Sequence, residues 1–377
     1  MRVTVLGAGR VGAAMARDLS LDATFDVRLV DRDVARLETV EARTGIPGER
    51  ADFSLPSTIA RAIADADLVV NAAPGFLGFS TLRAVIEAGK NVVDIAFFPE
   101  DPFELDALAR DKGVCAIVDC GVAPGLSNLL VGHAVRTLDV TESVSIYVGG
   151  LPADPKPPFE YRAVFSPIDV IEEYTRPARI VVDGEVVTRE ALSEIELLDF
   201  GDVGSLEAFN TDGLRTLMKT IDAPRMVEKT LRYPGHAEKM RLLRDTGLFS
   251  YEPIRVDDAD VRPIDLTSAL LFPLWHLQEG EEDITVFRVA VEGADSNGRI
   301  RKTFDLIDRF DRTAGITSMA RTTGYTATMA ARLIAQGRFT RAGITPPEGL
   351  AEDPAHVDFI LGGLRARGID VTVSEER

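Results

Sequence analysis

A glycine-rich turn near the start of the chain restricts the possible folds more than any other sequence feature. A short apolar run at 3–6 ends at Gly7, and Gly7, Gly9 and Gly12 form the pattern GxGxxG directly before an alanine-rich, helix-forming segment. In a strand–turn–helix unit the first glycine allows the tight turn, the second lets the backbone approach a pyrophosphate, and the third lets the helix pack on the strand. The helix N-terminus then offers free N–H groups to phosphates. The pattern therefore predicts a dinucleotide-binding site.

An acidic residue follows the second predicted strand, at 25–30, and indicates which dinucleotide binds. Asp31 lies 19 residues after Gly12, where dinucleotide folds place the acid that binds the adenosine ribose hydroxyls. A 2′-phosphate would meet a like charge there, so we predict NAD rather than NADP. Arg32 leaves room for the opposite choice, because an arginine at this point can either receive a 2′-phosphate or cover the adenine. The alternative role for Asp31 is to cap a helix that begins at Val34.

Strands and helices alternate through the first third of the chain. Apolar runs predict strands at 67–73, 91–94 and 114–118, with helices at 79–88 and 102–111 between them. This alternation is typical of a doubly wound parallel sheet, in which ligands bind beyond the carboxyl ends of the strands. The resulting cofactor-binding residues are Gly7, Gly9, Arg10, Val11, Gly12, Asp31, Arg32, Ala72, Ala73, Pro74, Ala123 and Pro124.

Length, charge and cysteine content exclude several classes of protein. With 377 residues the chain exceeds the usual size of one domain, so we expect two. The 42 Lys and Arg against 60 Asp and Glu give a net charge of −18, which argues against nucleic-acid or anionic-membrane partners. The two cysteines, Cys115 and Cys120, allow no disulfide framework and no zinc-type spacing, so we expect no metal. We also expect no signal peptide and a cytoplasmic location.

The strand pattern changes after residue 140. Two β-branched runs at 179–182 and 185–188 flank Asp183-Gly184 and predict a hairpin with a type I′ turn. A second hairpin is expected at 284–292 and 299–308, around 293–298. Antiparallel hairpins do not belong in a doubly wound sheet, so we predict a separate α+β domain.

Proline-rich segments and a helical C-terminal part complete the second half. We interpret 152–158 and 253–263 as loops and expect helices at 314–320 and 326–336. The predicted organisation is a Rossmann domain of residues 1–124 and 314–377, with an inserted domain at 125–313.

Five short motifs of the chain carry a family resemblance. They are NAAPGF (71–76), DCGVAPGLSN (119–128), FSPIDVIEEYTRPA (165–178), EAFNTDGLRTL (207–217) and KTLRYPGH (229–236). Together they resemble motifs of the saccharopine dehydrogenase family, most closely its NAD-dependent lysine 6-dehydrogenase branch. The resemblance implies an enzyme that oxidises an amine, or reduces an imine, beside a nicotinamide; in this branch the 6-amino group of L-lysine is converted to an aldehyde. It also implies a Rossmann domain interrupted by a substrate and dimerisation domain of mixed sheet, a homodimer or higher homo-oligomer, and a loop at 119–128 over the nicotinamide.

Amine oxidation requires a base for the substrate nitrogen and counter-charges for the rest of the substrate. His236 has the unperturbed pKa closest to neutral and is the first candidate base; Asp94, Asp119 and Tyr233 are the other catalytic candidates. The window 225–244 holds six basic and two acidic residues, a local charge of +4. Arginine binds carboxylates bidentately, and we interpret Arg241 and Arg244 as a solvated helix face. The expected substrate-binding residues are Arg232, Glu173, Asp212 and Lys229.

Two other functions stay open at this point. A saccharopine-type reductase would bind three carboxylates, so Arg162, Arg176 and Arg215 would have to converge with Arg232. A non-catalytic NAD-sensing regulator needs only the nucleotide domain, and the nearly 190 residues between 125 and 313 argue for a substrate domain instead.

Overall fold

The computed structural model describes residues 1–278 and 280–377 and divides the chain into two compact units. The first unit holds 1–137 and 320–371, and the second holds 138–319 and 372–377. Compared with the boundaries expected from the sequence, the segment 125–137 belongs with the nucleotide domain, and the segments 314–319 and 372–377 belong with the inserted domain.

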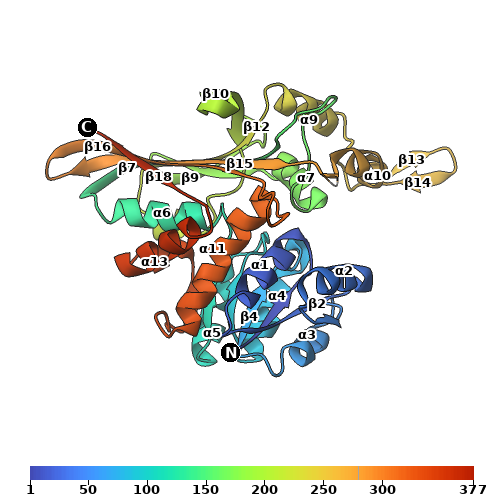
Figure 1. Cartoon of the computed structure of the whole chain (residues 1–377). Coiled ribbons are helices and arrows are strands. Elements are labelled where there is room, and N and C mark those ends of the chain that lie inside the picture. Colours follow the sequence, from blue (N-terminus) through green and yellow to red (C-terminus); the bar gives the residue numbers. More distant parts are fainter. Residues whose placement is uncertain (279) are drawn as a thin grey trace. The chain divides into compact units, whose positions relative to one another are not determined.

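The first unit is built on a seven-stranded parallel sheet in the order β17-β6-β5-β4-β1-β2-β3 (Figure 1). Its central strands are buried along almost their whole length, as expected when helices cover both faces of a parallel sheet. The strands are β1 (Arg2–Leu6), β2 (Asp26–Asp31), β3 (Gly48–Arg50), β4 (Leu68–Asn71), β5 (Asn91–Asp94), β6 (Cys115–Ile117) and β17 (Gly343–Thr345). The doubly wound Rossmann prediction is confirmed.

The helices of this unit are α1 (Arg10–Ser20), α2 (Val34–Thr44), α3 (Pro56–Ala62), α4 (Gly75–Glu87), α5 (Asp106–Asp111), α6 (Leu126–Val135), α11 (Ser318–Ala335), α12 (Pro347–Leu350) and α13 (Pro354–Arg365), with a 3₁₀ turn η1 at Pro102–Leu105. Side chains of α3, α4 and α5 pack on one face of the sheet in a single apolar cluster.

A buried carboxylate on α1 links this helix to α11 and to the residues just after α13. Asp18 of α1 accepts hydrogen bonds from Arg332 and Thr328 of α11 and from Arg367, just after α13.

Two helix predictions for this unit need correction. The helix expected at 79–88 begins already at Gly75, directly after Pro74. The two helices expected at 314–320 and 326–336 form one continuous helix, α11. Gly324 lies inside this helix, where a β-carbon would crowd the side chain of Met15 of α1.

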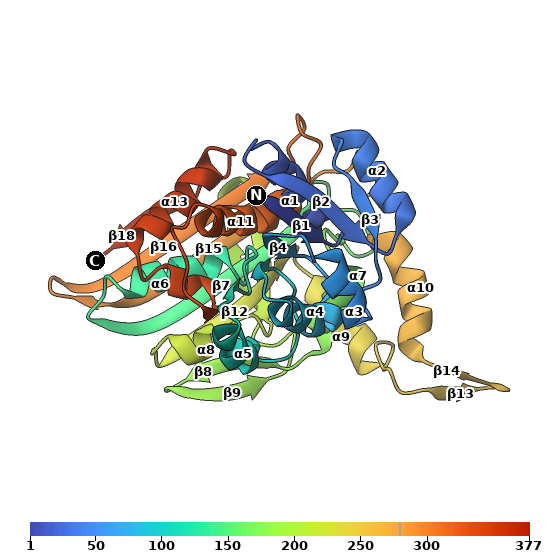
Figure 2. The ribbon, with the colours of Figure 1, turned by 90° about the horizontal axis from the view of Figure 1, so that it is seen from below.

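The second unit is built on a nine-stranded mixed sheet (Figure 2). The order β10-β11-β12-β7-β15-β16-β18 forms its main path, and the β8–β9 hairpin joins it at β12. Strands β12 and β7 run parallel and their neighbours antiparallel, so the inserted mixed-sheet domain is confirmed. The strands are β7 (Val140–Pro152), β8 (Ala178–Val182), β9 (Glu185–Arg189), β10 (Glu196–Asp199), β11 (Ser205–Asn210), β12 (Arg225–Arg232), β15 (Asp283–Asp295), β16 (Gly298–Arg309) and β18 (Thr372–Glu376).

Helices and one small hairpin complete this unit. An aromatic-rich core that includes Tyr161, Tyr174 and Trp275 lies among the helices. The elements are α7 (Pro167–Thr175), α8 (Leu217–Thr220), α9 (His236–Asp245), α10 (Pro263–Trp275), a 3₁₀ turn η2 at Gly201–Val203, and the two-stranded sheet β13 (Ile254–Val256) and β14 (Ala259–Val261). In the described part of the chain no helix is both long and apolar enough to cross a membrane.

The hairpin predictions for this unit are partly confirmed. Asp183 and Gly184 have φ angles of 52° and 83°, as a type I′ turn requires. The second hairpin has longer strands than expected, because pairing continues to Asp295 opposite Gly298. The segment 253–263 is a hairpin rather than a loop: its flanking prolines suggested irregular chain, but Asp257 adopts a positive φ of 50° and closes a turn.

Candidate functional site

The glycine turn has the geometry that a bound dinucleotide needs. Gly7 has a φ of +102°, which favours glycine, and a β-carbon on Gly7 would overlap the carbonyl of Ala72. A β-carbon on Gly12 would overlap the carbonyl oxygen of Gly7, so the start of α1 packs directly on the turn. A β-carbon on Gly9, by contrast, would meet no atom within 4 Å. The open side of the turn therefore lies at Gly9, where the pyrophosphate is expected to approach.

The start of α1 carries no side-chain cap. Gly9 is its N-cap residue, and no side-chain hydrogen bond closes the first turn, which contains Arg10 and Val11. The first N–H groups of a helix have no partner within the helix, and they carry a partial positive charge. The turn and the helix start thus fit a nucleotide cofactor whose phosphates bind the N–H groups of this first turn.

Asp31 supports the glycine turn from the end of β2. Its carboxylate accepts hydrogen bonds from the backbone N–H of Ala8 at 2.7 Å and of Asp33 at 2.9 Å. Asp33, not Asp31, caps α2, because its side chain accepts from the N–H of Arg36. The capping alternative for Asp31 is therefore wrong. A carboxylate has about four acceptor positions, so two remain for ribose hydroxyls. Arg32, beside it, is exposed.

Polar residues at the ends of β4, β5 and β6 come together at the same sheet edge. The amide of Asn71 donates to Asp94 at 2.9 Å, and the Asp94 carboxylate also accepts from the N–H of Ala96. The backbone carbonyl of Asp94 accepts from the N–H of Cys120, so Asp119 lies next to this group. Asp94 is completely buried and holds the strand ends together, as its hydrogen bonds require. Ala72, Ala73 and Pro74 form the adjoining loop between β4 and α4.

The loop before α6 is a tight turn. It contains a cis peptide bond between Ala123 and Pro124, and Gly121 pairs with Gly125 across it. Gly125 is the N-cap residue of α6, so this helix begins directly after the turn. Burial raises the pKa of the Cys120 thiol, and Asp119 and Asp94 raise it further. Cys120 is therefore a neutral packing residue of this loop.

In the second unit, β12 divides its charged side chains between two faces of the sheet. Side chains alternate along a strand, so Glu228, Thr230 and Arg232 share one face and Lys229 lies on the other. The ammonium of Lys229 pairs with Glu196 at 2.8 Å and donates to the carbonyl of Glu194. The structure therefore separates Lys229 from Arg232, although both were expected to bind substrate.

Arg232 is the centre of a buried polar cluster. Its guanidinium pairs with Glu173 of α7 at 2.7 Å, donates to the Tyr174 hydroxyl at 3.3 Å and lies over the ring of Tyr161. The Arg232 side chain is 3% exposed and that of Glu173 is 22% exposed. Burial raises the pKa of Glu173 and Arg232 lowers it, with a net upward shift. Glu173 is thus the member of the pair that solvent or a ligand reaches first.

His236 lies next to this cluster, and both of its ring nitrogens have hydrogen-bond partners. One nitrogen, Nδ1, lies 2.9 Å from the carbonyl of Phe159 and the other, Nε2, 2.9 Å from the Tyr174 hydroxyl. A carbonyl can only accept, so the neutral ring carries its proton on Nδ1 and accepts from Tyr174. Burial, with Arg232 nearby, lowers the pKa of His236 to about 3. In this arrangement His236 orients Tyr174 and remains neutral at physiological pH.

The other predicted residues of this unit have different partners. Asp212 receives three hydrogen bonds from Arg179, two from the guanidinium and one from the backbone, and ties β8 to the loop after β11. Tyr233 donates its hydroxyl to the carbonyl of Pro152 at 3.0 Å and packs with a separate apolar cluster. In the part of the chain that the structure describes, neither residue forms a hydrogen bond or ion pair with Arg232.

The arginines of α9 are not a solvated face. Arg241 donates to the carbonyl of Leu192 at 2.8 Å, and Arg244 donates to the carbonyl of Ala191 at 2.7 Å. Both side chains are partly buried and hold the segment between β9 and β10. Most of the basic side chains of the window 225–244 are therefore paired or hydrogen-bonded within the second unit.

Sequence reasoning missed Glu228, a fully buried acid on the Arg232 face of β12. Its carboxyl group lies 2.5 Å from the Thr211 hydroxyl, which is 2.9 Å from that of Thr230. Burial raises the pKa of Glu228 to about 8, and the nearby acids Glu173 and Asp212 add to the shift. The only sequence signal was the alternation of side chains along a strand, which places Glu228 on the same face as Arg232, four residues later.

We expect Glu228 to make the stability of the protein depend on pH. Its folded-state pKa of about 8 lies above the ordinary value of 4.5, so the stabilising contribution is complete below 4.5 and is lost as the pH rises through 8. The Glu228→Gln variant should therefore gain stability relative to wild type over this range, by up to several kcal/mol at about 1.4 kcal/mol per pKa unit. Urea unfolding at several pH values measures it. The exposed Glu185→Gln variant should show no such trend; a flat difference for Glu228→Gln would contradict the prediction.

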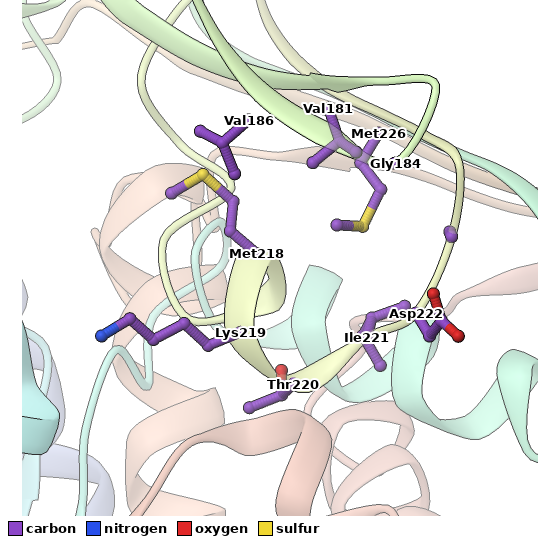
Figure 3. Close-up of a pocket in the computed structure, with 10 residues that line it drawn as sticks. Val181, Gly184, Val186, Met218, Lys219, Thr220, Ile221, Asp222 and Met226 are labelled. Atoms are coloured by element: carbon purple, nitrogen blue, oxygen red, sulfur yellow. The ribbon is translucent and has the colours of Figure 1, made fainter.

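The structure also contains a cavity of about 280 Å³ at the start of β12 (Figure 3). Val181, Val186, Met218 and Met226 supply most of its apolar lining, and the Lys219 side chain points away from it. Met226 and Arg232 are six residues apart on an extended strand, roughly 20 Å at 3.3 Å per residue. The cavity contains none of the predicted site residues. In the described part of the chain no three His, Cys, Asp or Glu side chains gather as a metal site.

Two family models together match almost the whole chain. The saccharopine dehydrogenase NADP binding domain matches residues 3–117, and the saccharopine dehydrogenase C-terminal domain matches residues 121–369. The chain belongs to the saccharopine dehydrogenase family. As a member of it, the protein is an NAD(P)-dependent oxidoreductase that acts on C–N bonds.

Individual relatives of this saccharopine dehydrogenase family member are distant. Saccharopine dehydrogenase [NADP(+), L-glutamate-forming] of Saccharomyces cerevisiae is 22% identical over 92% of this chain and 93% of its own length. Carboxyaminopropylagmatine dehydrogenase of Synechocystis is 22% identical over 94% of each chain. The mitochondrial alpha-aminoadipic semialdehyde synthase of Mus musculus is 25% identical over 67% of this chain, and the match spans only 29% of that protein.

A solved structure shows the same fold. The apo saccharopine dehydrogenase (L-Glu forming) from Saccharomyces cerevisiae superposes over all of both chains with a TM-score of 0.82 at 20% identity. The agreement over the full length of both chains supports the fold that the sequence predicts, a Rossmann unit with an inserted mixed-sheet unit.

Proposed function

We propose that the protein oxidatively deaminates a primary amine of a small amino acid with NAD as the oxidant, and that the 6-amino group of L-lysine is the substrate group. The observation that carries the proposal is the pairing of one buried arginine, Arg232, with one partly exposed carboxylate, Glu173. Lysine carries one carboxylate and two ammonium groups, and this pair offers one charge of each sign.

Two other arginines of the unit, Arg162 and Arg176, argue for a substrate with a single carboxylate. Arg162 pairs with Glu281 at 2.9 Å and donates to the carbonyl of Leu274. Arg176 is an i,i+4 partner of Glu172. Both guanidiniums thus have acids of their own, whereas a saccharopine-like substrate with three carboxylates needs several arginines at one place.

The cofactor, when bound, accepts the hydride from the carbon next to the substrate nitrogen. The chain's part is to hold the pyrophosphate at Gly9 and the start of α1 and the adenosine ribose at Asp31. In the second unit Glu173 binds a substrate ammonium, and Arg232 fixes the position of Glu173 and partly offsets the upward shift that burial causes in its pKa. The Tyr174 hydroxyl donates to Nε2 of His236, which holds Tyr174 in place. Ordered groups of this kind reduce the entropic cost of orienting the substrate.

A second candidate is a saccharopine-type reductase, which forms a C–N bond between an amino acid and an aldehyde. The full-length match to the yeast saccharopine dehydrogenase supports it. The deciding experiment follows NAD reduction with lysine, ornithine, 2,4-diaminobutyrate and saccharopine in turn. Turnover of lysine with no turnover of saccharopine is the expected result. Activity on saccharopine alone would establish the second candidate, and no activity on any of the four would contradict both.

NAD rather than NADP is the proposed cofactor because Asp31 presents a negative charge to the ribose. We expect wild-type protein to bind NADH about 10- to 100-fold more tightly than NADPH, the range that a charged hydrogen bond provides. Asp31→Asn should bring the two dissociation constants close together, because the charge is removed while an acceptor remains for the N–H of Ala8.

Titration calorimetry with both nucleotides measures this preference. Asp33→Asn is the matched control, since Asp33 only caps α2 and should leave the NADH to NADPH ratio unchanged. Tighter binding of NADPH by the wild-type protein would show that Arg32 receives a 2′-phosphate and that the proposal for NAD is wrong.

A further inference from the structure

Glu228 is a buried carboxyl group with no part so far in the proposed reaction. It lies on β12, on the same face as Thr230 and Arg232, and is 4% exposed. Its side chain accepts a hydrogen bond from the Thr211 hydroxyl at 2.5 Å, and Gly213 packs so closely that a β-carbon there would overlap the carboxyl group. The loop after β11 thus holds this carboxyl group in a fixed place inside the second unit.

Two threonine hydroxyls extend from this carboxyl group toward the Arg232 end of the face. The Thr211 hydroxyl lies 2.9 Å from that of Thr230. Because Thr211 uses its hydrogen to bond Glu228, the hydrogen between the two hydroxyls comes from Thr230. Both O–H groups therefore point toward Glu228, which is the direction in which a proton moves along the chain. Thr230 is two residues from Arg232, roughly 7 Å along the strand, and Arg232 holds Glu173.

The surroundings of Glu228 in the described part of the second unit supply acids but no unpaired cation. The charged groups on this face of β12 and on the elements beside it are Asp212 of the loop after β11, Glu173 of α7, Glu207 of β11, Arg179 of β8 and Arg232 of β12 itself. Arg179 pairs with Asp212 at 2.8 Å. Arg232 pairs with Glu173 in turn, so neither cation is a partner for Glu228.

Glu173 and Glu228 therefore differ as acids. Glu173 lies beside Arg232 and is partly exposed, so it offers a negative charge to a cation. Burial, with Glu173 and Asp212 nearby, raises the pKa of Glu228 to about 8, close to the pH at which an enzyme base works best. Carboxyl groups whose surroundings separate their pKa values divide acid–base work between them.

We propose that Glu228 accepts the proton that the substrate ammonium must lose before the neighbouring carbon gives up a hydride. The ammonium bound at Glu173 loses one proton and keeps the electrons of that N–H bond as the lone pair of a neutral amine. Thr230 and Thr211 each take up a proton and pass on their own, and Glu228 becomes a neutral carboxylic acid. A water molecule beside Glu173, or the substrate nitrogen itself, completes the chain at Thr230. The hydride leaves afterwards, to the nicotinamide cofactor.

This inference rests on the proposed amine oxidation and adds the base that the reaction requires. His236, with a pKa of about 3, is too weak a base for an ammonium group. Glu228 does not touch the substrate and acts through the two hydroxyls, so both its carboxyl group and the hydroxyl path can be tested.

The pH dependence of amine oxidation tests the carboxyl group. In the wild type kcat/KM should rise with pH and level off above about 8, because Glu228 must be ionised to accept a proton. Glu228→Gln should lose this inflection, and kcat should fall at least about 100-fold, the lower end of what a positioned base contributes. Glu196→Gln is the matched control, since Glu196 pairs with Lys229 on the other face of the sheet. A Glu228→Gln enzyme with the kcat and pH profile of the wild type would overturn the proposal.

Variants of Thr230 test the path. Thr230→Val replaces the hydroxyl by a methyl group, so kcat should fall about tenfold or more while NADH affinity stays within about twofold of wild type. Thr230→Ser keeps the hydroxyl and should retain most of the wild-type kcat. Thr188→Val, at an exposed position on β9, is the control for the loss of a threonine hydroxyl. A Thr230→Val enzyme as fast as Thr230→Ser would exclude this path.

The ionisation of Glu228 can also be followed without substrate, which separates this proposal from the proposed function. Infrared difference spectra of the full chain should contain a protonated-carboxyl band that titrates with a midpoint of about 8 and is absent in Glu228→Gln. Titration of Glu228 near the ordinary value of 4.5 would overturn the assignment whatever the enzyme oxidises. A wild type that shows the band but oxidises none of the amines would contradict the proposed function, and with it the role of Glu228 as proton acceptor.

Discussion

Arg232→Met is expected to destabilise the protein by about 3–5 kcal/mol, the range seen when one partner of a buried ion pair is removed. Glu173 then loses its counter-charge in a site where burial already raises its pKa. The variant also loses the contact with the Tyr161 ring and the hydrogen bond to Tyr174. We expect kcat/KM for the amine substrate to fall about 10- to 100-fold, since a charged hydrogen bond contributes about 1.5–3 kcal/mol.

A double variant separates the structural role of this pair from its role in substrate binding. Arg232→Met with Glu173→Gln removes both charges, so urea unfolding should show most of the stability restored, while activity should stay low. Arg241→Met is the matched control, because Arg241 binds only the carbonyl of Leu192 and should leave KM within about twofold of wild type. Full activity in the double variant would show that Arg232 and Glu173 serve packing alone.

Gly12→Ala is expected to abolish nucleotide binding and to lower the melting temperature by several degrees. The new methyl group would overlap the carbonyl oxygen of Gly7, so α1 would have to move away from the turn. Backbone atoms cannot yield as a flexible side chain does, and the strain falls on the segment whose N–H groups bind the phosphates.

Gly9→Ala is the companion variant. Its methyl group meets no atom within 4 Å, so the fold should be unaffected. The same methyl group occupies the side from which the pyrophosphate approaches, so NADH binding should weaken at least tenfold while the melting temperature stays within a few degrees of wild type. Differential scanning calorimetry and NADH fluorescence titration measure the two effects. Unchanged NADH affinity in Gly9→Ala would place the pyrophosphate elsewhere.

The nucleotide unit could be predicted from the sequence because its main features depend on residues that are close together along the chain. The glycine turn, Asp31 and the strand ends at Asn71 and Asp94 all follow one rule, that ligands bind at the carboxyl edge of a parallel sheet. The structure brings these residues to one edge, as the order β6-β5-β4-β1-β2 requires. The two helices expected at 314–320 and 326–336 are one helix in the structure, and its contact with Met15 of α1 at Gly324 is a tertiary feature that is invisible in a local pattern.

The polar cluster of the second unit could be predicted only in part. The motifs pointed to Arg232 and Glu173, and the structure pairs them. They pointed equally to Lys229, Asp212 and Tyr233, which have other partners. Motif membership says that a residue is constrained, but not whether a substrate or a neighbouring side chain imposes the constraint.

By itself, the sequence determined the Rossmann unit, the dinucleotide turn and the presence of an inserted antiparallel unit, because turn chemistry and strand periodicity act over a few residues. Only the tertiary structure decided the electrostatic state of the second unit's polar residues. His236, the first candidate base from its ordinary pKa, is buried beside Arg232 and stays neutral, whereas Glu228 holds its proton up to a pKa of about 8. The physical reason is that the pKa of a buried group depends on desolvation and on charges brought near by folding, neither of which has a sequence signature.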